Sequence, residues 1–499
     1  MLWLKSNDRV FKESLSNIRD AWMAPNPRSP VPGSVWTSVR IAFLLVAGLG
    51  ISSTCVLLAL GFDAFDKALI LHLVIIYGLV LVLFLLHRPQ IGLALLLIGG
   101  MMISREIGTG TETNLNGAFL LSPVIIGVWL LHMASSRGQY KTVSSRATMP
   151  LYFFMVTSVL AFFVGQYPWF PTPPASMLAQ LAQLAIFIFS CGLFLVAAYQ
   201  LQDLSWLKKI TYLFIGLGLV HLLVRLLPGS VSRLGRVLPD GVTMGSMFWT
   251  WLVAMSFGQG ILNRDLRRLN RLALIAVALT AIAVGLTQLE SWVSGWAPML
   301  ISVFIILFLR FPVPILIATP VIGLLAILGA GYFMDLATVG DNLYSYETRT
   351  AAIKAMIPVL SANPVLGLGP ANYYHYTALF PIEGWYVKYN SHNNYLDLIG
   401  QTGLLGLVFF LWFAWAVLKT GWNLRSKVMR GFEHAYAFSV LAGLVATLVA
   451  GALGDWIIPF IYNTGFPGYR TSVLPWIFMG GLIALEQRLT RKTWNSPSS

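Results

Sequence analysis

Apolar segments long enough to cross a membrane recur along most of the chain, and they restrict the fold more than any other feature. A helix needs about 20 apolar residues to cross the hydrocarbon core of a bilayer. Only 10% of the residues are charged and 57% are hydrophobic, whereas soluble domains average about 25% charged residues. In lipid, a segment must satisfy its own backbone polar groups, which a helix does. The sequence therefore predicts an all-α, polytopic membrane protein.

About fourteen transmembrane helices are predicted. They cover residues 41–62, 68–86, 90–104, 118–134, 150–165, 179–200, 209–227, 242–262, 272–288, 295–309, 311–332, 396–419, 434–457 and 473–485. They divide the chain into residues 1–40, a cytoplasmic segment; 41–332, with spans one to eleven; 333–393, a large, partly helical periplasmic loop; 394–487, with the last three spans; and 488–499, a cytoplasmic tail. Apolar residues at helical spacing in residues 1–40 favour a helix on the membrane surface, and an ordinary packed tail is the alternative.

The basic residues predict the orientation of these spans. If the N-terminus is cytoplasmic and the spans alternate, 24 of the 33 lysines and arginines fall on the cytoplasmic side. This is the bias that orients membrane proteins, and it also places the C-terminus in the cytoplasm. A net charge of +14 would suggest nucleic acid in a soluble protein. Here the charge lies in loops beside membrane lipids, so a nucleic-acid partner is not expected.

The outer loop at residues 333–393 is far longer than any other predicted connection, and long loops often carry function. Its aromatic residues are Tyr344, Tyr346, Tyr373, Tyr374, Tyr376, Phe380, Trp385, Tyr386 and Tyr389. They favour either a belt at the membrane edge or a platform that stacks sugar rings. Residues 347–360 predict a helix that stops before Pro364, with Arg349 in its first turn and Ile353, Met356 and Ile357 on the same face.

A polar segment follows at Asn390 and leads directly into an apolar span. His392 lies where this span begins, so a neutral imidazole at the membrane surface could accept a proton from a hydroxyl. The alternative is a histidine that only bonds a helix end, and His375 in the same loop is a second candidate base. Three glycines at every third position predict a bare helix stripe that a neighbouring helix approaches closely: Gly400, Gly403 and Gly406.

Arginines on the outer side run against the positive-inside bias and so indicate a function. Arg225, Arg233 and Arg236 lie at or just after the end of the seventh predicted span. Together with Arg349 they could bind a diphosphate, since guanidinium contacts phosphate in a two-pronged geometry. Contact with lipid headgroups is the alternative. The chain has no paired carboxylates and no His/Cys cluster of the kind that binds a catalytic cation, so neither a metal nor another cofactor is expected.

Two blocks of residues resemble the bacterial O-antigen ligase/polymerase superfamily. The first is Glu347-Thr348-Arg349, followed after a helical stretch by Asn363-Pro364-Val365-Leu366-Gly367-Leu368-Gly369. The second is Ser391-His392-Asn393-Asn394-Tyr395-Leu396, followed by the three glycines. Two positions depart from the family pattern: Ile353 replaces a frequent aromatic residue, and the stretch 288–292 lacks the arginine often found there.

The resemblance implies a glycosyltransferase of the bacterial inner membrane, with its active site on the periplasmic side. The donor would be a polyprenyl-diphosphate-linked oligosaccharide, and transfer to an acceptor sugar hydroxyl would be inverting. His392 would take the place of the catalytic histidine, Arg349 that of the loop arginine, and Arg233 or Arg236 that of the arginine after span seven. We expect glycan contacts at the residues Asn393, Tyr395, Tyr373 and Tyr374.

Three activities are consistent with these features. The span count favours a polymerase, which joins one lipid-linked repeat unit to another. A ligase, which transfers the glycan to lipid A-core, is the close alternative. A transporter or flippase of lipid-linked sugars would also use arginines that face a cavity. Transporters often carry internal repeats and broken, polar helices at mid-membrane, and neither feature is evident in the sequence.

Overall fold

The computed structural model describes residues 46, 67–108, 114–134, 143–227, 238–289, 292–328, 341–382, 384–428 and 430–495. The predicted segment 1–40 and, apart from residue 46, the first predicted span lie outside this part. The chain divides into two units. The first comprises residues 1–89 with 127–141, and the second comprises residues 90–126 with 142–499.

The described chain is almost entirely helical. The first unit contains α3 (Lys67–His87) and the end of α5 (Gly117–Ala134). The second begins with α4 (Gln90–Met102), α6 (Thr148–Val164), α7 (Met177–Gln200), α8 (Leu204–Leu226), α10 (Asp240–Thr243), α11 (Ser246–Leu262), α12 (Arg268–Gln288), α13 (Val293–Arg310) and α14 (Pro312–Leu328). It continues with α16 (Asp341–Ser361), α17 (Tyr373–Tyr376), the 3₁₀ turn η1 (Thr377–Leu379), α18 (Asn394–Leu424), α19 (Phe432–Leu453) and α20 (Gly465–Asn495).

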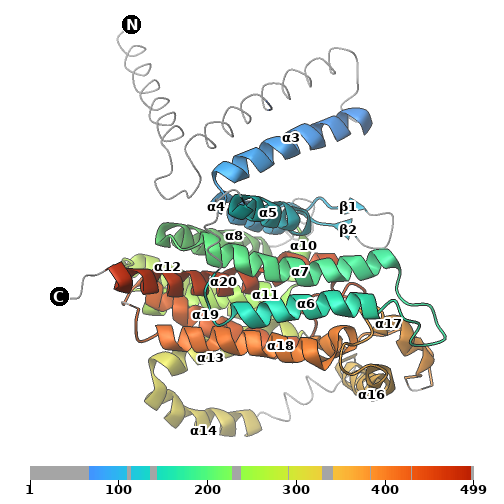
Figure 1. Ribbon diagram of the computed structural model, residues 1–499. Coiled ribbons are helices and arrows are strands. Elements are labelled where there is room, and N and C mark those ends of the chain that lie inside the picture. Colours follow the sequence, from blue (N-terminus) through green and yellow to red (C-terminus); the bar gives the residue numbers. More distant parts are fainter. Residues whose placement is uncertain are drawn as a thin grey trace. The chain divides into compact units, whose positions relative to one another are not determined.

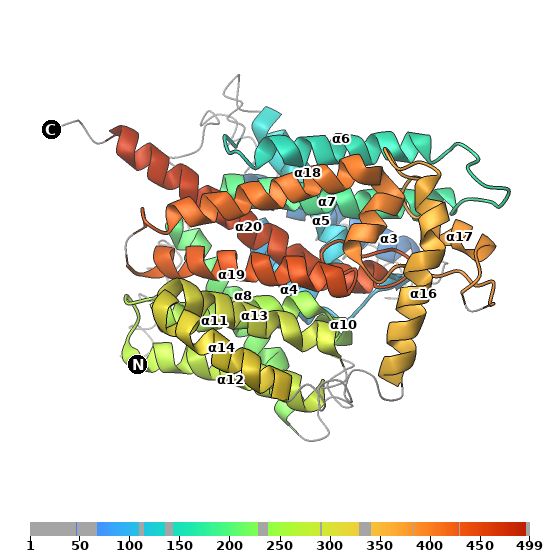
Figure 2. The same ribbon diagram turned by 90° about the horizontal axis from the view of Figure 1, so that it is seen from below.

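One small antiparallel sheet interrupts the all-α pattern. Strands β1 (Ile107–Gly108) and β2 (Asn114–Leu115) pair Ile107 with Leu115 and Gly108 with Asn114. Most helices of the second unit lie side by side, with α18 against α6 and α19, and α7 against α20 (Figures 1 and 2). Helix α16 runs across this direction, at the ends of the other helices (Figure 2).

Seven helices within the described residues are long and apolar enough to cross a membrane: α5, α7, α8, α12, α13, α18 and α19. This confirms a helical membrane protein. Each predicted span from the second onward overlaps at least one described helix, but the count of fourteen stays a prediction.

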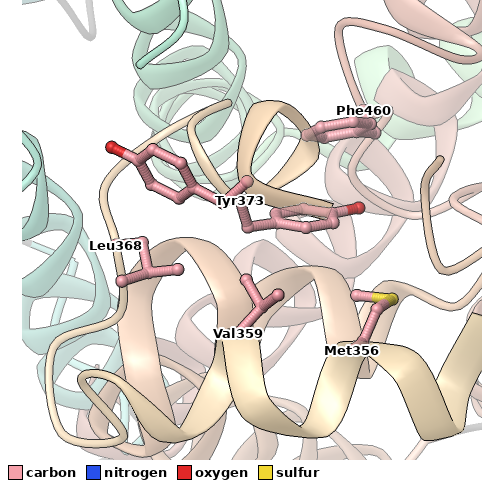
Figure 3. Packing of buried hydrophobic residues seen from close by; sticks show 6 residues of the cluster. Met356, Val359, Leu368, Tyr373 and Phe460 are labelled. Atoms are coloured by element: carbon pink, nitrogen blue, oxygen red, sulfur yellow. The ribbon is translucent and has the colours of Figure 1, made fainter. Parts of the chain in front are cut away.

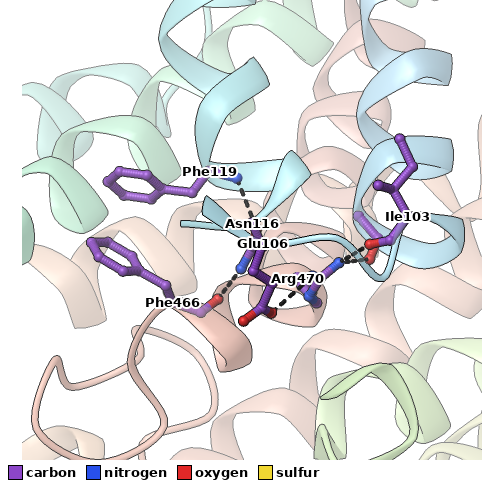
Figure 4. Close-up of polar contacts among 7 residues, drawn as sticks. Ile103, Glu106, Asn116, Phe119, Phe466 and Arg470 are labelled. Atoms are coloured by element: carbon purple, nitrogen blue, oxygen red, sulfur yellow. Dashed lines mark hydrogen bonds and ion pairs between the residues drawn. The ribbon is translucent and has the colours of Figure 1, made fainter. Parts of the chain in front are cut away.

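Helix α20 is much longer than the span predicted at 473–485. Hydropathy placed its start after Arg470, yet the helix begins at Gly465 and buries that arginine. Arg470 pairs with Glu106 at 2.9 Å and donates to the backbone oxygens of Gly100 and Ile103 at the end of α4 (Figure 4). Because these partners satisfy the guanidinium, it can lie inside the bundle.

The loops sort into two groups at opposite ends of the second unit. At one end, Ser145 contacts Glu486 at 3.2 Å, and Arg488 pairs with Glu433 at 2.8 Å. Both contacts join segments predicted to be cytoplasmic. At the other end, Asn372 donates to the carbonyl of Gly165 at 3.0 Å. The predicted orientation, including the side of the membrane that each end faces, stays a prediction.

Gly403 breaks α18, which corrects the predicted glycine stripe. Its backbone has φ 70° and ψ −174°, so the helix bends there. The broken turn receives a loop, not a neighbouring helix: the N–H groups of Leu404 and Leu405 donate to the carbonyls of Pro364 and Val365 at 2.8 and 3.2 Å. The atoms nearest to a side-chain carbon at Gly406 belong to Thr402 of its own helix. Backbone groups freed by a kink need new partners, and the loop supplies them at Gly403. Gly400 is approached instead by side chains of two other helices, Tyr373 of α17 and Leu360 of α16.

The glycines of the Pro-x-x-Gly-x-Gly segment make this insertion sterically possible. A side-chain carbon at Gly367 would lie 2.6 Å from the backbone nitrogen of Gly403. One at Gly369 would lie 2.6 Å from Cα of Gly165, just after α6. Both glycines have positive φ, 71° and 91°, which favours glycine. The segment therefore ties α18 to the end of α6.

A hydrophobic cluster joins α16 to this segment and to α17. Met356 and Val359 of α16 pack with Leu368, Tyr373 and Phe460, all fully buried (Figure 3). The predicted apolar face of this helix is partly wrong, because Ile353 and Ile357 are 38% and 57% exposed. The observed buried face runs through residues 352, 356 and 359, at the spacing of one helix face.

Candidate active site

Asn393 starts α18 and thereby sets the position of the residue before it, His392. The Asn393 side-chain oxygen accepts from the N–H groups of Tyr395 and Leu396 at 2.9 and 3.4 Å. This is a standard N-cap, worth about 1 kcal/mol. The amide nitrogen of Asn393 donates to the carbonyl of Ala452 at 3.1 Å, which ties the start of α18 to the end of α19.

His392 is half-buried and has a left-handed backbone, with φ 46°. Such a conformation costs a residue other than glycine about 1–2 kcal/mol, so the surrounding contacts must hold it. The Nδ1 atom of its ring lies 3.4 Å from the side-chain nitrogen of Asn463. Strained residues of this kind concentrate at functional sites.

Asp397 anchors the loop that carries His392. Its Oδ1 accepts from Ser391 Oγ at 2.7 Å and from the Tyr373 hydroxyl. Ser391 Oγ also accepts from the N–H of Asn393 at 3.0 Å. Burial, and then the neighbouring Asp397 charge, raises the pKa of Tyr373 well above its usual value, so Tyr373 stays a donor. The His392 loop is thereby bonded to both α17 and α18.

Asp455 organises the opposite wall. It is 1% exposed and lies between α19 and α20. Its Oδ1 accepts from Asn463 Nδ2 at 2.6 Å, and its Oδ2 accepts from Thr464 Oγ1 at 2.7 Å and from the N–H of Phe460 at 2.9 Å. A carboxylate that accepts several hydrogen bonds orders the loop that supplies them. Asp455 therefore sets the position of Asn463 beside His392.

The structure changes the expected glycan contacts. Tyr373 is fully buried and stacks on Phe460 with ring centroids 5.0 Å apart, so it has no surface to offer a sugar. This corrects the prediction, which rested on its place in a loop rich in aromatic residues. Tyr395 donates its hydroxyl to the carbonyl of Leu448 at 2.5 Å. Since the polar groups of Tyr395 and Asn393 have structural partners, any glycan contact there is an additional role.

Tyr374 is half-buried. It stacks on Tyr462 with ring centroids 4.8 Å apart and an interplanar angle of 17°. His375 Nε2 lies 3.1 Å from the hydroxyl of Tyr462. Burial, followed by the charge of Lys388, lowers the pKa of His375, which keeps it neutral at pH 7. Tyr374, His375 and Tyr462 therefore form an aromatic group. Tyr374 and His375 lie just before η1, and Tyr462 lies one residue before Asn463.

The predicted arginines are located only in part. Arg225 ends α8 and donates to Thr243 Oγ1 at 2.7 Å, and the side chain of Gln288 donates to its carbonyl at 3.4 Å. Arg349 lies in α16, but its side chain is outside the described part, as are Arg233 and Arg236 altogether. The arginine cluster therefore stays a prediction.

Sequence reasoning missed Asp397, Asp455 and Asn463. The sequence does contain a signal for the two acids. Asp397 and Asp455 each interrupt or directly follow a strongly apolar segment, where an ionisable residue is costly and usually functional. Asp397 also follows Asn393 at the i+4 spacing of one helix face. No such signal marks Asn463, since its role depends on contacts with residues 71 and 8 positions away.

Part of the chain is similar to a known protein family. A family profile described as O-antigen ligase matches residues 269–411. The match spans α12 to the middle of α18 and includes Arg349, the Pro-x-x-Gly-x-Gly segment and His392. The resemblance to the O-antigen ligase/polymerase superfamily is confirmed. No curated protein matches the chain.

The O-antigen ligase region contains the break in α18 and the α16 helix, whereas Asp455 and Asn463 lie beyond its end. The candidate site thus combines the matched region with the turn between α19 and α20. This match supports a membrane enzyme of the O-antigen ligase or polymerase type. It also indicates lipid-linked glycans as the class of substrate.

Proposed function

We propose that this protein transfers a glycan from a polyprenyl diphosphate to an acceptor sugar hydroxyl at the periplasmic face of the bacterial inner membrane. The observation that carries the proposal is the construction around His392. A half-buried imidazole with a strained backbone is held by an N-cap, a buried carboxylate and a facing amide. Several contacts that together hold one strained side chain in place are typical of an active site.

In the proposed reaction, the acceptor oxygen attacks the anomeric carbon of the donor sugar. The bond between that carbon and the diphosphate oxygen breaks, the polyprenyl diphosphate leaves, and the hydroxyl proton passes to His392. Attack from the face opposite the leaving group inverts the anomeric configuration. General-base catalysis of this kind contributes about 10²–10⁴ in rate.

The leaving diphosphate needs positive partners as its charge grows. We propose Arg349, together with Arg225 and Arg233 or Arg236, for this role. Arg349 belongs to α16 and lies within the region that the family profile matches, which supports the proposal.

We propose Tyr374, with Tyr462 behind it, as the aromatic surface for a sugar ring in place of Tyr373. The polymerase and the ligase differ only in the acceptor, so the same site serves both. We favour the polymerase, in which the acceptor is a second lipid-linked repeat unit. The family match favours either enzyme over a transporter.

The defining experiment is transfer by purified protein in lipid. With a polyprenyl-diphosphate oligosaccharide alone, a polymerase yields ladders of longer lipid-linked chains. A ligase instead requires added lipid A-core and yields a single joined product. The absence of both products in protein that binds the donor and is correctly folded would refute the proposed function.

Treatment with EDTA is expected to leave the transfer rate unchanged within about twofold. The physical reason is that the described residues include no group of three or more His, Cys, Asp or Glu side chains placed to bind a metal ion, while arginines can supply the positive charge. The rate is measured before and after chelation, with a known magnesium-dependent transferase as a control. Loss of activity that magnesium or manganese restores would contradict the arginine mechanism.

Arg349→Ala is expected to weaken donor binding and to slow transfer as well. The same guanidinium would contact the diphosphate in the ground state and more strongly in the transition state. Arg349→Lys should recover only part of both, because an ammonium lacks the two-pronged geometry. Lys354→Ala, an exposed position on the same helix, is the matched control. Wild-type kinetics in Arg349→Ala would remove Arg349 from the site.

A further inference from the structure

The start of α19 lies at the other end of this helix from the candidate active site, which contacts its last turn. There, one carboxylate holds two loops together. Oδ2 of Asp265, in the loop between α11 and α12, accepts from the backbone N–H of Phe432, the first residue of α19, at 3.1 Å. Arg264 directly precedes Asp265, and Arg430 lies two residues before Phe432. This contact therefore brings two arginines from different loops to one place.

A third arginine comes from α13. This helix packs against α19 and ends at Arg310. The charges of Arg264, Arg310 and Arg430 all act on the imidazole of His434, which lies in the first turn of α19. We call Arg264, Arg310 and Arg430 the α19 arginines. They come from three separate connections: the loop after α11, the end of α13 and the loop before α19.

The α19 arginines carry a net positive charge. All three are exposed, and none of them pairs with a carboxylate of the described residues. Asp265 contributes one negative charge but uses an oxygen on the N–H of Phe432, and Glu433 pairs with Arg488 at 2.8 Å. Neighbouring guanidiniums in excess over carboxylates are suited to bind a phosphate, which accepts two hydrogen bonds from each.

The surroundings of Arg310 favour a lipid over a soluble phosphate. Its guanidinium lies over the ring of Phe311, 4.8 Å from the centroid, and the side chains of Phe311 and Val313 are 43% and 64% exposed. Both α13 and α19 are long and apolar enough to cross a membrane, so residues at their ends lie near the headgroups. A phospholipid offers a phosphate to the guanidiniums and an acyl chain to the apolar side chains beside them.

We propose that the α19 arginines form a binding site for one anionic phospholipid, with its phosphate on the guanidiniums and an acyl chain along Phe311 and Val313. The inference is independent of the proposed function, because it concerns the opposite end of α19. General attraction to an anionic surface contributes about fivefold in affinity for each basic residue near that surface. A built site differs from this attraction in one respect, since it depends on which basic residues are present and not only on how many.

Two triple variants of the whole chain separate these cases. The first is Arg264→Gln/Arg310→Gln/Arg430→Gln. The matched control is Arg268→Gln/Lys419→Gln/Arg491→Gln, which removes the same charge from exposed positions on α12, α18 and α20. Each protein, in a neutral detergent, is titrated with phosphatidylglycerol, and the bound lipids are counted by native mass spectrometry. Phosphatidylcholine and inorganic phosphate are the comparison ligands.

The wild-type protein should bind one phosphatidylglycerol more tightly than any further copies. The first triple variant should lose roughly 10²-fold in this affinity, about fivefold for each arginine, whereas the control should lose less than about fivefold in total. Phosphatidylcholine should bind about tenfold more weakly to the wild-type protein, because its choline cancels the headgroup charge. Inorganic phosphate should not displace the lipid, since it lacks the acyl chain.

If the first triple variant does not fold, Arg430→Gln and Arg268→Gln are compared instead, with an expected difference of about fivefold. Three results would overturn the inference. Equal losses in the variants compared would mean general attraction to surface charge without a site. Equal affinity for phosphatidylcholine would mean that the arginines do not recognise the anionic headgroup. Displacement of phosphatidylglycerol by inorganic phosphate would assign the α19 arginines to a soluble phosphate.

Discussion

His392→Ala should lower turnover by roughly 10²–10⁴, the usual range for loss of a general base, while binding of the lipid-linked donor persists. The substitution removes the imidazole but leaves the N-cap of Asn393, which uses that residue's own side chain. The left-handed backbone at this position costs about 1–2 kcal/mol for any residue other than glycine. The cost for alanine should differ from that for histidine by only a fraction of this amount. The protein should therefore stay folded.

The measurement compares donor binding with product formation on purified protein of matched expression and thermal stability. His434→Ala is the control, since His434 lies in the first turn of α19 beside Glu433, which pairs with Arg488 of α20. It should keep both properties. If His392→Ala loses donor binding but retains its rate at saturation, His392 is a binding residue, and the base must be sought elsewhere, first at His375.

Gly403→Ala should destabilise the protein by more than about 2 kcal/mol. A backbone at φ 70° and ψ −174° is almost restricted to glycine and alone costs about 1–3 kcal/mol for alanine. A methyl group would in addition overlap the carbonyl of Val365. That carbonyl accepts the N–H of Leu405 across the break in α18. The variant must therefore displace the Pro364–Gly369 segment or straighten the helix.

Thermal unfolding in detergent measures this effect, and transfer assays on the surviving folded protein measure its consequence for the site. Gly216→Ala in α8 is the control, because no heavy atom lies within 4 Å of the added carbon. That change should be neutral or slightly stabilising, as alanine favours helices over glycine by about 1 kcal/mol. Equal stability of the two variants would mean that the break in α18 is not needed for folding.

These variants separate two kinds of residue within one motif region. His392 is expected to act on substrate, whereas Gly403, Gly367 and Gly369 shape the backbone that holds it. The glycines owe their identity to positive φ angles and close backbone contacts. A change at a glycine should therefore lower stability and activity together, while a change at His392 should lower activity alone.

Much of the fold could be predicted from the sequence because its causes are local. A helix follows from hydropathy and periodicity within one segment, and each predicted span from the second onward overlaps a described helix. The position of His392 at the start of α18 was also predictable, since a polar run meets an apolar one there.

Tertiary structure decided the rest. Asn463 lies beside His392, 71 positions away, and only the packing of α18 against α19 and α20 brings them together. In the sequence, Gly403 is one of three evenly spaced glycines, and nothing distinguishes it from the other two. Only the structure shows that a loop enters α18 at Gly403. Tyr373 and Arg470 look exposed by their neighbours in sequence, yet both are buried because distant partners satisfy their polar groups. Local pattern determines which segments form helices, but long-range contacts determine which polar side chains meet, because a hydrogen bond depends on distance in space.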